Sequence, residues 1–161
     1  MSRLSIPAVV DAPAASQPLL AVVHKKLGVV PNLMKLLGQS PAALEGYLSL
    51  SGALDKGVLN AKLRESLALA VAEFNGCDYC LAAHSYIGKN LVKLSDDEIA
   101  QARDGRATDA RNDAALRAAG FSDAETVEIV LHVALNVLTN YVNNVAHTDV
   151  DFPRVSAHTH A

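Results

Sequence analysis

Apolar residues recur every three to four positions along most of this chain, which is the spacing of the buried face of an amphipathic helix. No stretch alternates apolar and polar residues as a strand would, and no stretch repeats another. The pattern therefore predicts an all-α, single-domain helical bundle over residues 16–153, with an extended N-terminal arm (1–15) and a C-terminal tail (154–161). The expected helices span residues 17–28, 31–38, 40–57, 61–76, 77–88, 96–105, 113–120 and 122–145.

Small polar residues mark where these helices begin, because a side-chain oxygen at the N-cap can accept a hydrogen bond from a free backbone N–H. The expected N-cap residues are Ser16, Ser40, Asn60, Ser95 and Ser122. Pro41 stands at the first helical position, where its missing N–H costs nothing. Glu125 follows the last of these caps by three positions, which is the spacing of a capping box.

The helix over residues 61–76 combines a buried face with two candidate carboxylates. Its apolar positions are Leu63, Leu67, Ala70, Val71 and Phe74. Glu65 lies at the edge of this buried face, where a partly buried carboxylate needs a partner. Glu73 lies near the end of the helix and is expected to face solvent.

The last helix carries a broad apolar stripe and a row of polar residues. The apolar positions are 127, 130, 131, 134, 135, 138, 141 and 142. A contact between subunits could bury this helix, and we expect a homo-oligomer. His132 lies within the stripe and is expected to be a core or interface histidine rather than a catalytic one. Asn136, Asn140, Tyr141 and Asn143 indicate a contact between helices or subunits, with a substrate contact as the alternative.

Composition excludes several classes of partner. The formal net charge is −3 with both signs mixed, and no basic block is present, so we expect no nucleic-acid partner and no membrane partner. No stretch approaches the roughly 18 apolar residues of a spanning helix, and the N-terminus lacks a secretory apolar core. Two cysteines are too few for a secreted disulfide framework. We therefore expect a cytoplasmic protein, in which a Cys-x-x-Cys pair is more often reactive than structural.

Both cysteines, Cys77 and Cys80, lie in the segment EFNGCDYCLAAHS, and His84 follows the second by one helical turn. Three interpretations are open: a redox dithiol, a metal site, or two small buried neighbours. Because Gly76 ends one helix, the first cysteine opens the next, where free N–H groups and the helix dipole favour a thiolate. His84 can take the proton of Cys80, and Glu65 can be its partner. Cys80 is expected to be the less exposed thiol.

A metal site is the least supported of these three interpretations. A tetrahedral zinc site needs a fourth ligand. The available histidines, His24, His132 and His147, do not lie at ligand spacing to the cysteine pair. We therefore predict neither a metal nor a cofactor.

The residues around the cysteines resemble the core of the alkylhydroperoxidase D / carboxymuconolactone decarboxylase family. The redox branch of that family carries a Glu, a Cys-x-x-Cys pair and a His four residues past the second Cys. Those positions match Glu65, Cys77, Cys80 and His84 with the usual spacings. The segments VPNLMKLLGQSPAALEGYLSL and LNVLTNYVNNVAHTDVDFP also resemble the family, so the resemblance covers residues 18–153.

The resemblance implies an all-helical, usually oligomeric enzyme that acts as a thiol-dependent peroxidase on a small-molecule hydroperoxide. Cys80 would attack the peroxide and become a sulfenic acid, and Cys77 would resolve it as a disulfide. His84 would serve as the base for Cys80, with Glu65 orienting it. A thiol reductant or a redox partner protein would then reduce the disulfide.

Two features depart from the family pattern. Tyr79 stands where some members carry a second histidine between the cysteines, and residues 105–120 form a shorter link than the family has before the last helix. We expect Tyr79 and Tyr86 to be packing residues that wall the thiol pocket. No role is expected for His158 and His160 in the tail.

Two other functions stay open at this point. A carboxymuconolactone decarboxylase-like enzyme would use the pocket without the thiols, although that branch generally lacks the cysteine pair. A non-catalytic redox-sensing protein would oxidise the pair without turnover. Glu65 also has a simpler interpretation, as a surface carboxylate paired with Arg64 or Lys62.

Overall fold

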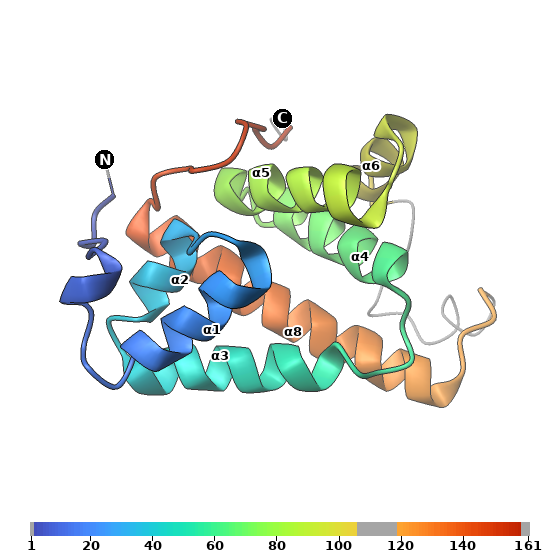
Figure 1. The fold of residues 1–161 in the computed structure, drawn as a ribbon. Helices are drawn as coiled ribbons and strands as arrows, with labels where there is room; N and C mark the ends of the chain where they lie inside the picture. The colour runs from blue at the N-terminus through green and yellow to red at the C-terminus, as the bar shows by residue number, and fades with distance from the viewer. Residues whose placement is uncertain (1, 106–118, 159–161) are drawn as a thin grey trace.

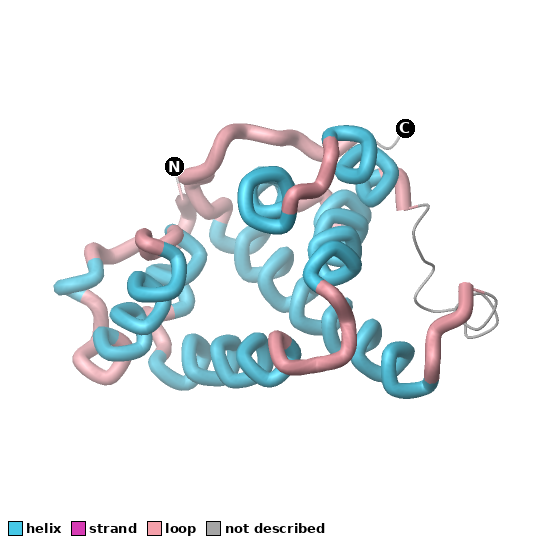
Figure 2. Tube along the Cα trace, turned by 45° about the vertical axis from the view of Figure 1, so that its right-hand side comes forward, coloured by secondary structure: helices cyan, strands magenta, loops and turns pink. Residues whose placement is uncertain are grey.

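The computed structural model describes residues 2–105 and 119–158, and all regular structure within these residues is helical. Figure 2 shows helices joined by loops throughout this part of the chain. The predicted all-α fold class is therefore confirmed. The helix expected over residues 113–120 and the shortened link lie largely outside the described residues.

The described helices are η1 (Val9–Asp11), α1 (Gln17–Leu27), α2 (Asn32–Leu37), α3 (Pro41–Leu54), α4 (Ala61–Phe74), α5 (Asp78–Ile87), η2 (Gly88–Val92), α6 (Asp96–Arg103) and α8 (Asp123–Ala146). The helices from η1 to α6 follow one another with short connections, and residues 104–122 separate α6 from α8. The long helix α8 contacts α3, α4 and α5, while α4 also contacts α6 (Figure 1). The helices that carry the cysteines and Glu65 therefore lie in the middle of the bundle.

Four of the five predicted N-caps form as expected. The side chains of Ser40 and Asn60 accept hydrogen bonds from the third residue of their helices, and complete capping boxes form at Ser95 and Ser122. Ser16 is the exception, because its backbone is already helical and its side chain makes no capping hydrogen bond. Its hydroxyl is instead buried without a partner among the described residues.

Glu73 is buried, which corrects the expectation that it faces solvent. Only 3% of the residue is exposed, whereas the adjacent Phe74 is 73% exposed. Arg103 of α6 donates from Nε to Glu73 at 2.7 Å, and the backbone N–H of His158 also donates to this carboxylate. Burial opposes the ionisation of Glu73, but these hydrogen bonds and the Arg103 charge outweigh it and lower its pKa. The ion pair with Arg103 of α6 thus explains why the Glu73 side chain points inward, although its position near the helix end predicted an exposed one.

The segment after α8 returns across α5. Asp151 accepts a hydrogen bond from the Tyr79 hydroxyl at 2.8 Å and another from the backbone N–H of Asn32 at 2.8 Å. The Phe152 ring packs edge-on against Tyr79 with centroids 5.8 Å apart. Farther along, the N–H of Ala157 donates to Asp78 at 2.9 Å. The N–H of His158 donates to Glu73 of α4, so the segment up to residue 158 contacts α2, α4 and α5.

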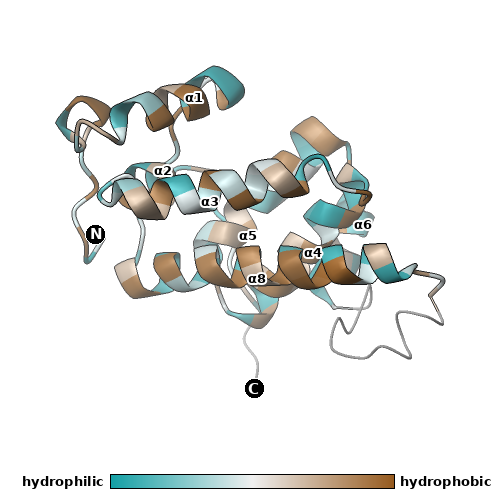
Figure 3. Cartoon of the chain, turned by 90° about the horizontal axis from the view of Figure 1, so that it is seen from below, coloured by the Kyte–Doolittle hydropathy of each residue, from teal (hydrophilic) through white to brown (hydrophobic). Residues whose placement is uncertain are grey.

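The helix α8 turns much of its polar side inward. Its buried residues are Ile129, His132, Leu135, Asn136, Thr139, Asn140, Asn143 and Ala146. Its exposed large apolar residues, which we call the outer row of α8, are Val127, Val130, Leu131, Leu138, Tyr141 and Val145. Figure 3, which views the molecule from below, shows apolar colour along this helix. Most of the predicted apolar stripe thus lies on the surface of the single chain.

We predict that Glu73→Ala lowers the free energy of unfolding by about 3 kcal/mol, because it leaves the Arg103 guanidinium largely buried without its carboxylate. The measurement is urea unfolding followed by circular dichroism. Glu45→Ala, on the exposed side of α3, is the matched control and should change stability by less than about 0.5 kcal/mol. Equal losses in the two variants would contradict the anchoring role of Glu73.

Candidate functional site

A tight turn between α4 and α5 brings the four predicted site residues together. Gly76 adopts a positive φ of 59°, a conformation that glycine reaches without strain. Cys77 then serves as the N-cap of α5, and its sulfur accepts a hydrogen bond from the N–H of Cys80 at 3.3 Å. The turn folds α5 back along α4, so that His84 meets Glu65.

Glu65 and His84 form a partly buried pair. The Nδ1 atom of His84 lies 2.9 Å from Oε2 of Glu65, with side-chain exposures of 23% and 16%. Burial disfavours the charged imidazole, but the adjacent carboxylate outweighs this effect and raises the pKa of His84. The alternative partners of Glu65 are engaged elsewhere, since Arg64 pairs with Asp55 at 3.5 Å and Lys62 with Glu98 at 2.8 Å.

The two thiols are both buried and differ sharply in acidity. The neighbouring Cys77 thiol as a hydrogen-bond donor, the charge of His84 and the nearby amides of Asn143 and Asn140 outweigh burial and lower the pKa of Cys80 to about 7. The amide nitrogen of Asn143 lies 3.2 Å from the Cys80 sulfur. The neighbouring sulfur and burial together raise the pKa of Cys77. The sulfur favoured as a thiolate is therefore Cys80, not the one at the helix start.

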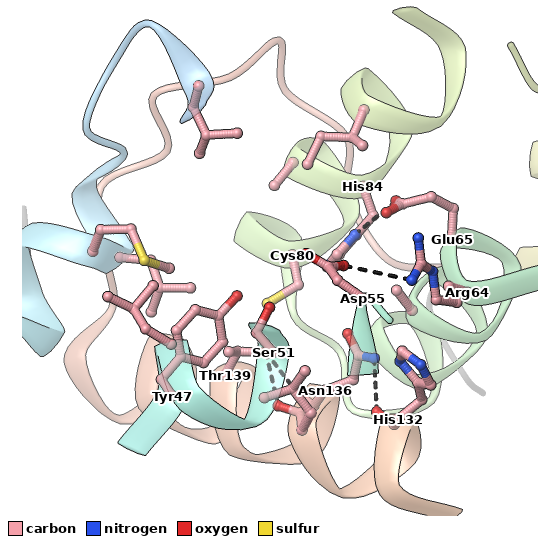
Figure 4. A pocket seen from close by; sticks show the side chains of 18 of the residues that line it. Tyr47, Ser51, Asp55, Arg64, Glu65, Cys80, His84, His132, Asn136 and Thr139 are labelled. Carbon is pink, nitrogen blue, oxygen red and sulfur yellow. Dashed lines mark hydrogen bonds and ion pairs between the residues drawn. The ribbon is translucent and has the colours of Figure 1, made fainter. Parts of the chain in front are cut away.

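The exposures of the two thiols correct the prediction that Cys80 is the less accessible. Cys77 is 0% exposed and Cys80 is 2% exposed. Cys80 lines a cavity of about 310 Å³ between α1, α2, α3, α4, α5 and α8, whereas Cys77 does not line it. Glu65 and His84 line the same cavity (Figure 4). The thiol with the lowered pKa is thus the one that faces the cavity.

The asparagines of α8 belong to this site, whereas the sequence indicated a contact between helices or subunits, with a substrate contact as the alternative. Asn143 contacts Cys80, and Asn140 accepts a hydrogen bond from the Asn75 side chain at 3.0 Å. Their helical spacing was the available signal, but spacing does not reveal which helix they face. Tyr141, assigned to the same row, is 58% exposed and lies on the outer row of α8.

The two tyrosines of α5 have different positions. Tyr79 is buried and lines the cavity, and its hydroxyl accepts from the N–H of Leu33 at 3.1 Å. Burial raises its pKa. Tyr86 is 44% exposed and packs against Phe152 outside the cavity, so it does not wall the thiols as expected.

The described part of the chain shows neither a metal-type cluster of side chains nor a helix of membrane-spanning type. No group of three His, Cys, Asp or Glu side chains there is placed to hold a metal ion. None of the described helices is long and apolar enough to cross a membrane.

Comparisons with known proteins identify the family and the fold. The sequence profile of the carboxymuconolactone decarboxylase family matches residues 41–124. An uncharacterized protein of Haemophilus influenzae is 46% identical over 48 residues, which are 29% of this chain and 42% of that protein. The chain thus matches less than half of the length of this curated relative.

Two solved structures share the fold. An uncharacterized peroxidase-related protein from Ralstonia eutropha JMP134, with an alkylhydroperoxidase AhpD core, has a TM-score of 0.70 and 23% identity, covering 93% of this chain and 92% of its own. The debrominase Bmp8 in its apo form has a TM-score of 0.69 and 18% identity, covering 93% of this chain and 91% of its own. At these identities the likeness shows a common fold.

We predict that the alkylation rate of Cys80 rises with pH around a midpoint near 7, because only the thiolate reacts. Cys77→Ala should raise that midpoint by about one to two units, since a hydrogen bond to the anion is lost. Cys77→Ser is the matched control, because its hydroxyl still donates, and it should raise the midpoint less. The measurement is iodoacetamide labelling with mass spectrometry of the Cys80 peptide. An unchanged midpoint in Cys77→Ala would rule out this source of acidity.

Proposed function

The chain belongs to the carboxymuconolactone decarboxylase family, and we propose that it is a thiol-dependent peroxidase that reduces hydroperoxides with Cys77 and Cys80. One observation carries the proposal. A thiol with a lowered pKa faces a cavity beside a Glu65–His84 pair, and a second thiol lies directly behind it. A structural pair of buried cysteines would need neither the lowered pKa nor the adjacent ion pair.

In the first step, the Cys80 thiolate attacks the terminal oxygen of a hydroperoxide. A sulfur–oxygen bond forms, the oxygen–oxygen bond breaks, and Cys80 becomes a sulfenic acid. The leaving alkoxide takes a proton and departs as an alcohol. His84 supplies this proton and stays oriented by Glu65, which holds Nδ1 and leaves Nε2 for the reaction.

In the second step, Cys77 attacks the Cys80 sulfenic acid, a disulfide forms and water leaves. The negative charge of the neighbouring sulfur is one reason that Cys77 keeps its proton in the reduced protein. Oxidation of Cys80 removes that charge and so favours deprotonation of Cys77. Two molecules of an external thiol, or a redox partner protein, then reduce the disulfide and are oxidised to a disulfide themselves. Because Cys80 faces the cavity, the reductant attacks that sulfur.

Two alternative functions have less support. A decarboxylase-like enzyme would use the same cavity without the thiols, and its activity would survive alkylation of Cys80. A redox sensor would form the disulfide once without turnover. The debrominase Bmp8 has this fold and a different reaction, so peroxide turnover, rather than cysteine oxidation alone, is the property that identifies a peroxidase.

We also propose that the protein is a homo-oligomer that buries the outer row of α8. The row places six large apolar side chains on one helix, each at least 41% exposed in the single chain. The exposed side chain of Phe74 lies near the C-terminal end of the outer row of α8, because the adjacent Asn75 is hydrogen-bonded to Asn140 and Asn144. A second copy of this neutral face would match it without unpaired charges.

We predict that Cys80→Ser lowers hydroperoxide turnover by roughly a hundredfold or more, because a serine hydroxyl is not ionised near neutral pH. Without an external thiol, Cys77→Ser should reduce about one equivalent of peroxide and keep Cys80 as a sulfenic acid, since the chain has no other thiol to resolve it. The measurement is peroxide consumption, in multiple turnover with excess dithiothreitol and in single turnover without it. Full activity in Cys80→Ser would exclude this function.

We predict that Leu138→Glu, in the middle of the outer row of α8, dissociates the oligomer, because association would bury an unpaired charge. The measurement is molar mass by light scattering after gel filtration. Val29→Glu, at an exposed valine in the loop between α1 and α2, is the control and should keep the mass of the wild type. A monomeric wild type would contradict the proposed assembly.

A further inference from the structure

The charged groups at one corner of the cavity do not balance. The Nζ atom of Lys26 lies 2.5 Å from one oxygen of Asp55, and Nη1 of Arg64 lies 3.5 Å from the other. All three residues line the cavity, and Figure 4 shows the contact of Arg64 with Asp55. Glu65, the other carboxylate on this wall, is already paired with His84. Two cations therefore share one carboxylate, and this group of three residues, which we call the cationic corner, keeps an excess of positive charge.

Arg64 has donors available for a ligand. Its Nη1 atom also donates to the backbone oxygen of Leu54 at 3.2 Å, whereas Nε and Nη2 make no hydrogen bond to any described residue. The side chain is 23% exposed, and neither of these two atoms is buried. Nε and Nη2 lie on one edge of the planar guanidinium, which is the geometry that binds both oxygens of a carboxylate. This edge is the part of the cationic corner that can receive an anion.

The cationic corner and the reactive sulfur lie toward opposite ends of α8. Three residues after Asp55, the N–H of Val58 donates to Glu128 near the start of this helix at 2.8 Å, and Glu128 itself does not line the cavity. Cys80 instead contacts Asn143, about four helical turns farther along. An anion bound at the corner is thus held away from the negative charge of the thiolate.

A row of residues on α3 runs along the wall to the cationic corner. Tyr47, Ser51 and Asp55 recur every four positions, so they lie on one face of this helix and its C-cap, and all three line the cavity (Figure 4). Burial raises the pKa of Tyr47 to about 12 and the charge of Cys80 adds to this effect, so a neutral hydroxyl lies near the sulfur. Asp55 lies two helical turns, or roughly 12 Å, beyond Tyr47. A ligand that contacts both the sulfur and the cationic corner therefore needs a chain of several carbon atoms.

We propose that this cavity takes an organic hydroperoxide that carries a carboxylate, with the peroxide group at Cys80 and the carboxylate on the free edge of Arg64. The proposal rests on the peroxidase function and names its substrate class. The corner attracts the carboxylate while the thiolate repels it, so the charge fixes which end of the substrate meets the sulfur. Arg64 thereby selects and orients the substrate without taking part in the chemistry.

The kinetic test uses hexanoic, octanoic and decanoic acids with a hydroperoxide on the terminal carbon, each compared with its methyl ester. With dithiothreitol saturating, the wild type should prefer at least one acid over its ester by roughly tenfold or more in kcat/KM, because the acid makes charge-assisted hydrogen bonds. Arg64→Gln should bring that ratio close to unity, mainly through KM. The absence of a preference for any acid, or an undiminished preference in Arg64→Gln, would overturn the proposal.

A matched control removes a positive charge outside the cavity. Lys25 is exposed and does not line the wall, so Lys25→Gln should keep the wild-type ratio although it changes the net charge by the same amount. Salt provides a test that needs no variant. Raising the ionic strength should lower kcat/KM for the acid and not for the ester, since ions screen the partly exposed corner. An equal loss in Lys25→Gln, or a ratio that salt does not change, would contradict the role of Arg64.

A binding experiment separates this inference from the peroxidase function. Octanoate carries no peroxide, and in calorimetric titration of the reduced wild-type protein it should bind roughly tenfold or more tightly than octanol. Arg64→Gln should remove that difference. If no hydroperoxide is turned over but octanoate shows the difference, the peroxidase function fails while the carboxylate site stands. If hydroperoxides are turned over and octanoate binds no better than octanol, the carboxylate site is overturned and the peroxidase function stands.

Discussion

The stabilisation of a buried sulfur anion at Cys80 is the interaction on which the rest of this structure depends. A thiolate that is 2% exposed cannot rely on water, so the protein must supply its hydrogen bonds and counter-charge. These come from three places in the chain: Cys77 in the same turn, Asn143 on α8, and His84 one helical turn along α5. Each must be held in position by contacts of its own, as Glu65 holds His84.

The helix α8 shows how this requirement shapes the bundle. Its inward side provides Asn143 and Asn140 to the thiol site and His132 to the wall of the cavity. Because that side is polar, much of the apolar surface of the helix lies on the opposite side, where the single chain does not cover it. The polar residues that α8 supplies to the site are therefore one reason that its apolar residues are exposed in the single chain.

The two sulfurs also differ in their access to the cavity. The cavity reaches Cys80 from the side of α1, α2 and α3, while Cys77 stays behind it. On the other side, the segment after α8 covers α5 through the Asp151–Tyr79 hydrogen bond and the Phe152 ring. A small oxidant can thus reach one sulfur first, and the second sulfur responds only from within the protein.

The sequence by itself determined the α-helices of the described residues, four of five N-caps and the placement of Cys77, Cys80 and His84 in one helix and its cap, because these follow from short-range spacing. The contact of Glu65 with His84 joins two helices, and the sequence offered it only as one of the possible partners of Glu65. The acidity of Cys80 combines the local contributions of Cys77 and His84 with burial and the α8 asparagines, and only the tertiary structure supplies the last two. The same holds for Glu73, whose burial requires Arg103 and His158 from distant segments. It also holds for α8, where two rows with helical spacing compete and only contacts with other helices select the row that faces inward.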